Sequence, residues 1–255
     1  MNSLKDEIII ITGSTRGIGK STAKALAKKG AAVMVNGRDE KSVNRVVKEI
    51  KEQGGRAEGL AKSVIEEDAG KMLVEKSVGA FGGLTGIINN AGITRDRISY
   101  KMELKDFMDV IDSHVKSTFI CSTEAIRYFK SNERSAFILN TTSLAGILGN
   151  PGQINYSAAK SAVIGMTLTL AKELKNKKIQ VNALAPAALT DMTRLFIEKA
   201  ATEEEAAYWD IGTPDQVADF ICEFIEKRSI KQTGEIYAVN KSEKGCWIPP
   251  SYEVL

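Results

Sequence analysis

The sequence has one histidine, His114, and three cysteines that lie far apart, Cys121, Cys222 and Cys246. A single histidine excludes a multi-histidine metal site and leaves a Ser-His-Asp hydrolase with one candidate base. An odd number of widely spaced cysteines suggests neither a disulfide framework nor a zinc site. We therefore expect no metal, and chemistry carried by other side chains.

Long apolar runs and blocks of one charge sign are also missing. No stretch approaches the roughly 18 apolar residues of a membrane-spanning helix, and Lys5, Asp6 and Glu7 directly precede the short apolar run Ile8 to Ile11. The net charge is +3, from 35 basic and 32 acidic residues spread along the chain. This balance argues against nucleic acid or a membrane surface as the main partner. The sequence predicts a soluble, cytoplasmic protein.

Apolar runs of strand length alternate regularly with longer helical stretches. This order is typical of an α/β fold with a doubly wound parallel sheet, and 255 residues with 43% hydrophobic content suit a single domain over residues 1–255. The predicted strands are 7–12, 31–36, 56–61, 84–89, 135–141, 179–185 and 234–239. The predicted helices are 17–29, 40–53, 66–81, 103–131, 152–176 and 214–227.

The segment near 189–212 breaks this alternation with an amphipathic helical insert after a strand. In an open α/β sheet, an insert beyond the carboxyl end of a strand lies over the ligand crevice. A mobile substrate lid and a static packing helix are equally compatible with the sequence.

Three glycines stand between the first predicted strand and an Ala-rich helix. Glycines at this place let the backbone approach a pyrophosphate, whose charge the helix N-terminus favours. Their spacing is Gly-x-x-x-Gly-x-Gly, which differs from the Gly-x-Gly-x-x-Gly of the long-chain dinucleotide folds. The predicted cofactor loop consists of Gly13, Ser14, Thr15, Arg16, Gly17, Ile18 and Gly19.

The end of the second predicted strand bears on the choice of cofactor. A carboxylate at its tip would bind the adenosine ribose diol and repel a 2′-phosphate, whereas an arginine there pairs with the phosphate. Gly37 and Arg38 stand at the tip, and Arg16 lies in the glycine loop. These residues favour NADP(H) over NAD, although Asp39 follows directly.

Ser143, Tyr156 and Lys160 form the candidate catalytic group. Tyr156 and Lys160 are four residues apart, so on a helix they share one face. A phenol is a poor acid or base at neutral pH, and a fixed ammonium beside it favours the phenolate. Ser143 could supply a hydroxyl to the same substrate oxygen. Taken alone, a Tyr and a Lys at this spacing are more often ordinary surface residues.

Together these motifs resemble the short-chain dehydrogenase/reductase family. The matching pieces are the glycine loop, Asn89-Asn90-Ala91-Gly92, Ser143, Tyr156 with Lys160, the run from Asn182 to Pro186, and Thr233-Gly234. The resemblance runs nearly end to end and implies a Rossmann-like sheet of about seven strands and a nicotinamide cofactor. It also implies interconversion of a ketone and a secondary alcohol.

The resemblance also implies roles for single residues. Tyr156 would act as general acid or base, Ser143 would hydrogen-bond the same substrate oxygen, and Lys160 would bind the nicotinamide ribose and lower the pKa of Tyr156. Further positions along the cofactor would be Ser63, Val64, Asn90, Ala91, Gly92, Pro186 and Thr190.

Four positions depart from the family pattern. His114 stands where an Asn normally holds a water of the proton relay. The backbone carbonyl of His114 could still hold this water. Ser63 replaces an Asp that contacts adenine, and Ala187 replaces a Gly after Pro186. Asn240-Lys241-Ser242 replaces the usual Asp-Gly-Gly.

The substrate class follows from two further likenesses. His114 and the run from Ala185 to Thr193 look like the 3-hydroxyacyl-CoA dehydrogenase domains of multifunctional β-oxidation enzymes, whereas the run from Asn89 to Asp96 is similar to 3-oxoacyl-carrier-protein reductases. Both act on a β-keto or β-hydroxy acyl thioester, carried by CoA or an acyl carrier protein. Reduction of another ketone, such as a steroid, sugar or secondary metabolite, and a weakly catalytic or non-catalytic subunit are the alternatives.

The resemblance further implies a homo-oligomer, a dimer or tetramer, with faces on the helices 103–131 and 152–176. The tail from Cys246 to Pro250 is apolar for a terminus. It could pack on a neighbouring subunit or fold back on its own domain.

Overall fold

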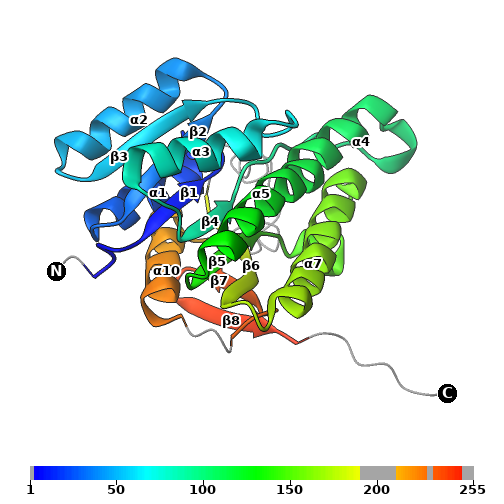
Figure 1. Cartoon of the computed structure of the whole chain (residues 1–255). Coiled ribbons are helices and arrows are strands. Elements are labelled where there is room, and N and C mark those ends of the chain that lie inside the picture. The colour runs from blue at the N-terminus through cyan, green and yellow to red at the C-terminus, as the bar shows by residue number, and fades with distance from the viewer. Residues whose placement is uncertain (1–2, 190–210, 229–231, 249–255) are drawn as a thin grey trace.

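The computed structural model describes residues 3–189, 211–228 and 232–248. Their strands form one eight-stranded sheet in the order β3-β2-β1-β4-β5-β6-β7-β8. Neighbours from β3 to β7 pair in parallel, and β8 pairs antiparallel to β7. Helices cover both faces of the sheet (Figure 1). The predicted doubly wound α/β fold is confirmed.

The strands are β1 (Ile8–Ile11), β2 (Ala32–Gly37), β3 (Arg56–Ala61), β4 (Gly86–Asn89), β5 (Ala136–Thr141), β6 (Ile179–Ala187), β7 (Ile236–Asn240) and β8 (Glu243–Trp247). The helices are α1 (Gly17–Lys28), α2 (Glu40–Glu52), α3 (Ala69–Phe81), α4 (Leu104–Ile111), α5 (Ser117–Asn132), α6 (Ala145–Leu148), α7 (Ile154–Leu174) and α10 (Pro214–Lys227). A short 3₁₀ turn, Ser99–Lys101, precedes α4.

The central strands are buried on both faces, which explains why they read as continuous apolar runs. One hydrophobic cluster joins the sheet to α1, α2 and α10, through residues such as Leu26, Val46 and Ile221. A second cluster joins the other face to α3, α5 and α7, through residues such as Leu73 and Phe129. In the part of the chain that the structure describes, each helix is too short or too polar to cross a membrane.

The helix predicted over 103–131 is interrupted. A π-helical segment, Asp112–Lys116, separates α4 from α5 and has His114 at its centre. A π-helical turn inserts one extra residue into a helix and is common at functional sites. The apolar periodicity of residues 103–131 does not reveal one extra residue inserted into the helix. The sequence therefore predicted one helix where the structure has α4, a π-helical segment and α5.

The eighth strand was not predicted, and the count of about seven is corrected to eight. Glu243, Lys244 and Gly245 have low strand propensity and are exposed at the sheet edge, so no apolar pattern marks them. The turn before β8 places Lys241 at φ +53°, which lets β8 return along β7. The fold-back alternative for the tail is therefore confirmed for Cys246 and Trp247, while residues 249–250 lie outside the described residues.

Candidate functional site

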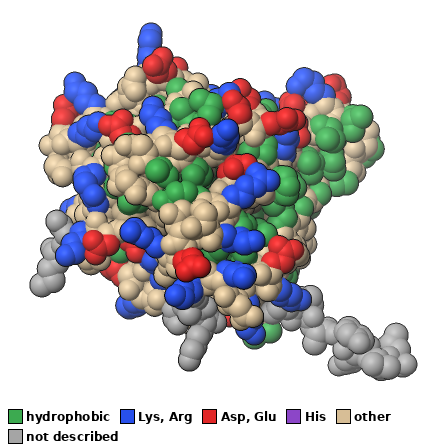
Figure 2. Space-filling model, in the orientation of Figure 1, with side chains coloured by type: hydrophobic (Ala, Val, Ile, Leu, Met, Phe, Trp, Pro, Cys, Tyr) green, Lys and Arg blue, Asp and Glu red, His purple; other side chains and the backbone are tan. Residues whose placement is uncertain are grey.

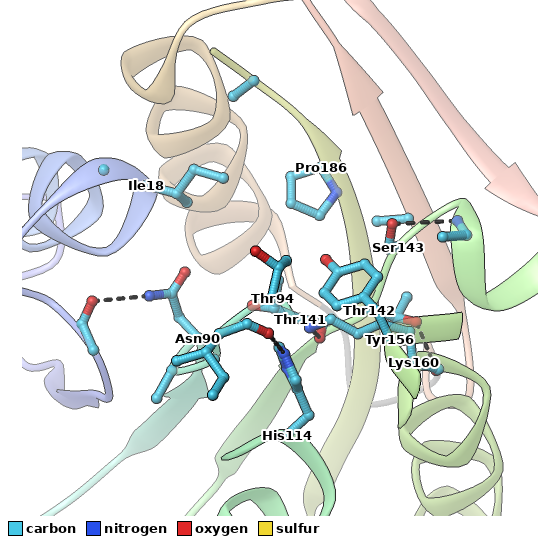
Figure 3. Close-up of a pocket in the computed structure, with 18 of the residues that line it drawn as sticks. Ile18, Asn90, Thr94, His114, Thr141, Thr142, Ser143, Tyr156, Lys160 and Pro186 are labelled. Atoms are coloured by element: carbon cyan, nitrogen blue, oxygen red, sulfur yellow. Dashed lines mark hydrogen bonds between the residues drawn. The ribbon is translucent and has the colours of Figure 1, made fainter. Parts of the chain in front are cut away.

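The carboxyl ends of β1, β4, β5 and β6 open into one cavity of about 1240 Å³. Its walls come from the glycine loop after β1, the segment after β4, the segment after β5 and the start of α7 (Figure 3). The sheet order reverses between β1 and β4, and ligands of open α/β sheets bind outside such a switch point. The predicted site residues therefore meet where this fold places a ligand.

Most residues predicted for the cofactor do line this cavity. They are Gly13, Thr15, Arg16, Gly17, Ile18, Arg38, Ser63, Val64, Asn90, Ala91, Gly92, Tyr156, Lys160 and Pro186. Ser14 and Gly19 are buried behind the loop surface. Thr190 and most of the predicted lid lie outside the described residues. Ala187, a departure from the family pattern, also lines the cavity.

The glycines of the loop are required by close backbone approach. Gly13 has φ +62°, and a Cβ there would lie 2.8 Å from the Ala91 Cα. A Cβ on Gly19 would lie 2.5 Å from the Gly13 carbonyl oxygen. The Asn90 side-chain amide donates to the carbonyls of Thr12 and Gly13, both at 3.1 Å. Asn90 thus fixes the loop from the side of β4, leaving backbone N–H groups at the start of α1 facing a cradle that suits a pyrophosphate.

A buried pair that the sequence did not single out, Ser14 and Asn36, holds the loop from the other side. The Ser14 N–H donates to the Asn36 carbonyl at 2.8 Å, and the Asn36 N–H donates to Ser14 Oγ at 2.9 Å. Asn36 Oδ1 accepts from the Gly13 N–H at 3.3 Å. Its Nδ2 donates to the carbonyls of Leu60 and Lys62. One side chain thus joins the ends of β2 and β3 to the glycine loop.

The far end of the cavity is basic. Arg16 and Arg38 are exposed and line it, next to Gly37. The Asp39 carboxylate instead accepts a hydrogen bond from the Ser42 N–H at 2.8 Å and caps α2. The Ser42 side chain, and after it this backbone hydrogen bond, lower the pKa of Asp39. Asp39, which weakened the case for NADP(H), therefore serves as the N-cap of α2.

Ser143, Tyr156 and Lys160 converge at the inner end of the cavity (Figure 3). Ser143 follows β5, and the other two lie one turn apart on α7. Ser143 Oγ accepts from the Ala145 N–H at 3.2 Å and lies beside the Tyr156 ring, and Lys160 Nζ lies 5.5 Å from the centre of that ring. Lys160 is buried, and its Nζ donates to the Thr141 carbonyl at 2.6 Å. The predicted group of three is thus assembled in space.

The pKa values at this end depart from the expectation that Lys160 favours the phenolate. Tyr156 is partly exposed to the cavity, yet burial raises its pKa to about 12, and the hydrogen bond from Ser143 offsets this only in part. Burial also lowers the pKa of Lys160 to about 7. Desolvation outweighs the attraction between the two groups, because the same environment disfavours both charges. Tyr156 is therefore a protonated phenol at neutral pH in this structure.

His114 lies beneath Tyr156, with their ring centres 5.2 Å apart and the ring planes at 83° (Figure 3). Its Nε2 is 2.8 Å from the Ile93 carbonyl oxygen. Because a carbonyl only accepts, Nε2 carries the proton. Burial and the positive charge of Lys160 hold the pKa of His114 well below its usual value, so the ring is neutral.

Two further polar groups at the start of α7 escaped sequence reasoning. Asn155 is fully buried, donates to the Arg95 carbonyl at 2.9 Å and accepts from the Tyr156 N–H at 2.8 Å. Gln153 donates to the Asp96 carboxylate at 2.7 Å. Burial raises the pKa of Asp96. Only their nearness to Tyr156 in sequence could have indicated Asn155 and Gln153.

Comparison with known proteins agrees with this geometry. A sequence model of the family described as short chain dehydrogenase matches residues 7–204. The chain is 43% identical over 195 residues to the 3-oxoacyl-[acyl-carrier-protein] reductase of Synechocystis sp., covering 76% of this chain and 78% of that protein. It is 36% identical over 243 residues to the 3-oxoacyl-[acyl-carrier-protein] reductase FabG of Thermotoga maritima, covering 93% and 97%. A crystal structure of a short chain dehydrogenase from Mycobacterium avium superposes with a TM-score of 0.87 at 30% identity, covering 99% of this chain and 89% of that one.

Proposed function

Because the chain belongs to the short chain dehydrogenase family, and is thus an oxidoreductase of CH–OH and C=O groups with a nicotinamide cofactor, we propose that it is an NADP(H)-dependent reductase of a 3-oxoacyl thioester. One observation carries the proposal. A single cavity has the glycine loop and two arginines at one end and a serine-tyrosine pair at the other. The relatives named as 3-oxoacyl-[acyl-carrier-protein] reductases support the thioester, carried by an acyl carrier protein or CoA.

The residues at the glycine end fit a dinucleotide. The cradle between Gly13 and Ala91 would be filled by a Cβ, and the start of α1 presents backbone N–H groups to it. We assign the pyrophosphate to this loop and the 2′-phosphate to Arg16 and Arg38. We assign the adenine to Ser63 and Val64, and the path to Tyr156 to Asn90, Ala91, Gly92 and Pro186, because all six line the cavity.

When bound, the nicotinamide cofactor supplies the hydride that reaches the carbonyl carbon. We assign the proton to Tyr156, whose raised pKa keeps the phenol protonated at neutral pH and so ready to donate in the direction of reduction. The Ser143 hydroxyl donates to the same carbonyl oxygen and stabilises the negative charge that develops there. Lys160 is assigned to the cofactor ribose and to proton return to Tyr156.

The NADP(H) assignment is tested at Arg38. We expect the Arg38→Asp protein to bind NADPH about 10- to 100-fold more weakly, because a charge-assisted hydrogen bond is replaced by repulsion, with NADH binding unchanged or improved. Fluorescence titration with both cofactors measures this. Arg127→Asp, on the exposed surface of α5, is the matched control. Equal losses for NADPH and NADH would contradict the assignment.

The substrate class is tested by the consumption of NADPH with acetoacetyl-CoA, and with the same acyl group on an acyl carrier protein. We expect turnover with at least one of them. Turnover confined to a steroid or sugar ketone would favour the alternative substrates on the same fold. Saturable NADPH binding without turnover of any ketone would favour a non-catalytic subunit.

Two predictions remain proposals. We infer one catalytic domain with the segment near 189–212 beside the substrate, and a homo-oligomer formed through α4, α5 and α7. Exposed apolar side chains on or next to these helices, such as Leu104, Phe119, Leu148 and Ile154, support the second, and Figure 2 shows hydrophobic side chains gathered near α4. Sedimentation of the purified protein measures the oligomeric state.

A further inference from the structure

The His114 ring fills the space that a side chain at position 92 would need. A Cβ built on Gly92 would lie 2.0 Å from His114 Cε1 and 2.5 Å from Nδ1, far inside van der Waals contact. The ring is 3% exposed. It also makes a T-shaped contact with the Tyr156 ring, with the ring centres 5.2 Å apart. His114 thus lies between the segment after β4 and the proposed proton donor.

The hydrogen bonding of His114 connects its ring to the segment after β4. The single N–H of the neutral ring is used by the Ile93 carbonyl. Nδ1 is buried and has no hydrogen-bond partner within residues 3–189, 211–228 and 232–248. The hydrogen bond that the described residues give the ring therefore holds it to the segment after β4.

The π-helical segment accounts for this placement. His114 is the middle residue of Asp112–Lys116, and the Ser117 hydroxyl donates to the Ser113 carbonyl at 2.6 Å at the end of that segment. The extra residue of a π turn rotates the side chains that follow it relative to those before. α4 can therefore pack on α7 while the imidazole faces Gly92 and Tyr156.

We propose that His114 is a positioning residue that acts through a size-matched pair with Gly92. The ring sets the separation between the Asn90–Ile93 segment, on the cofactor side of the cavity, and the Tyr156 ring. This rests on the proposed function for the role of Tyr156, but the pairing itself is a property of the fold. It differs from a relay role, in which the imidazole would exchange protons.

A double-mutant cycle tests the pairing. In Gly92→Ala the added methyl group displaces the ring, and we expect NADPH affinity and turnover of a β-keto thioester each to fall, turnover by about 10²-fold, the loss typical of an ångström-scale misplacement. His114→Ala alone lowers turnover less. The double variant Gly92→Ala/His114→Ala recovers a large part of the Gly92→Ala loss, because the methyl group enters the space that the ring has left. Gly79→Ala, whose Cβ would meet nothing within 4 Å, is the control: NADPH affinity and turnover stay as in wild type, and stability rises slightly because alanine replaces glycine inside α3.

The readouts separate this inference from the proposed function. Unfolding free energy and NADPH affinity report the coupling even if no β-keto thioester is turned over, so a failure of the substrate assignment leaves the cycle readable. Coupling in stability alone, with additive effects on NADPH affinity and turnover, would reduce the pair to a packing contact and overturn the positioning role. Additive effects in all three measurements would overturn the pairing itself.

A second variant covers the case in which Gly92→Ala does not fold. His114→Gln keeps an N–H donor near the position of Nε2 but has no ring. We expect kcat to fall while its pH profile between pH 5 and 8 keeps its shape, because a ring that only positions Tyr156 adds no ionisation to the reaction. Loss of one limb of that profile would show that His114 transfers protons and would overturn the proposal.

Discussion

The two ends of the cavity are stabilised in opposite ways. At the glycine loop, the buried Ser14 and Asn36 are hydrogen-bonded to backbone atoms of β1, β2 and β3, and the half-buried Asn90 is bonded to the carbonyl of Thr12, just after β1. At the reaction end, Tyr156, Lys160 and His114 are held in surroundings that disfavour their charged forms. The first end gains stability from its polar groups, whereas the second gives up stability because its ionisable groups are buried away from water. Binding and chemistry should therefore respond separately to mutation.

Among changes that leave Tyr156 in place, Ser143→Ala should have the largest effect. Removing the hydroxyl that contacts the phenol and the developing oxyanion lowers kcat about 10²- to 10³-fold, the usual cost of losing one such donor. NADPH affinity should stay within about a factor of two of wild type, the effect typical of a substitution outside the binding contacts. Ser157→Ala, which removes a buried hydroxyl without a hydrogen-bond partner among the described residues, serves as the control. A loss of NADPH affinity equal to the loss in kcat would contradict the claim that binding and chemistry respond separately to mutation.

The penalty at Lys160 should be visible as a pH dependence of stability. Its pKa is about 7 in the folded chain but near 10.4 when unfolded, so between these values the unfolded chain binds a proton that the folded chain does not. Folding stability then rises with pH by up to about 1.4 kcal/mol per unit. Below pH 7 the full penalty is present.

Lys160→Met removes this contribution. The variant should gain most over wild type at pH 7 and below, and the difference in unfolding free energy should shrink as the pH rises toward 9.5. Denaturant unfolding at several pH values measures it, with the exposed Lys172→Met on α7 as the control. A difference that does not change with pH would mean that Lys160 carries no such penalty.

Asn36→Ala tests the glycine-loop end of the cavity. It leaves the Gly13 N–H and the carbonyls of Leu60 and Lys62 without their partner, at a cost of about 1–3 kcal/mol in unfolding free energy. We expect NADPH affinity to fall about tenfold, as a 1.4 kcal/mol loss implies, with kcat at saturating NADPH unchanged. The exposed Asn132→Ala on α5 is the control. A fall in kcat with unchanged affinity would reverse the assignment of the two ends.

The smallest effect is expected at the amino-terminal end of β6, away from the cavity. Lys178 precedes β6 with φ +56°, where glycine carries no Cβ penalty, so Lys178→Gly should stabilise the protein by up to about 1 kcal/mol without changing kcat or NADPH affinity. Lys177→Gly, a neighbour outside the left-handed region, should bring no gain. Thermal unfolding of the two variants side by side measures the difference, and equal shifts would show that backbone strain at Lys178 is absent.

Sequence reasoning reached what local patterns encode. The apolar runs gave seven of the strands, and the glycine loop and the Tyr-Lys spacing indicated residues that the structure brings into one cavity. It could not reach pairs that only the fold creates. Asn36 lies 22 residues from Ser14, and His114 meets Gly92 only because a π turn shifts the helix. The sequence also failed to predict that the pKa of Tyr156 is raised, because the four-residue spacing of Tyr156 and Lys160 does not show how deeply they are buried.

The most direct test of this account measures kcat and NADPH affinity together on Tyr156→Phe. Phe keeps the ring against His114 and removes only the proton that Tyr156 donates. Turnover of acetoacetyl-CoA should fall at least about 10³-fold, within the range known for general acids, while fluorescence titration gives the wild-type NADPH affinity. Full turnover in Tyr156→Phe, or loss of NADPH binding in proportion to turnover, would contradict the separation of the two ends.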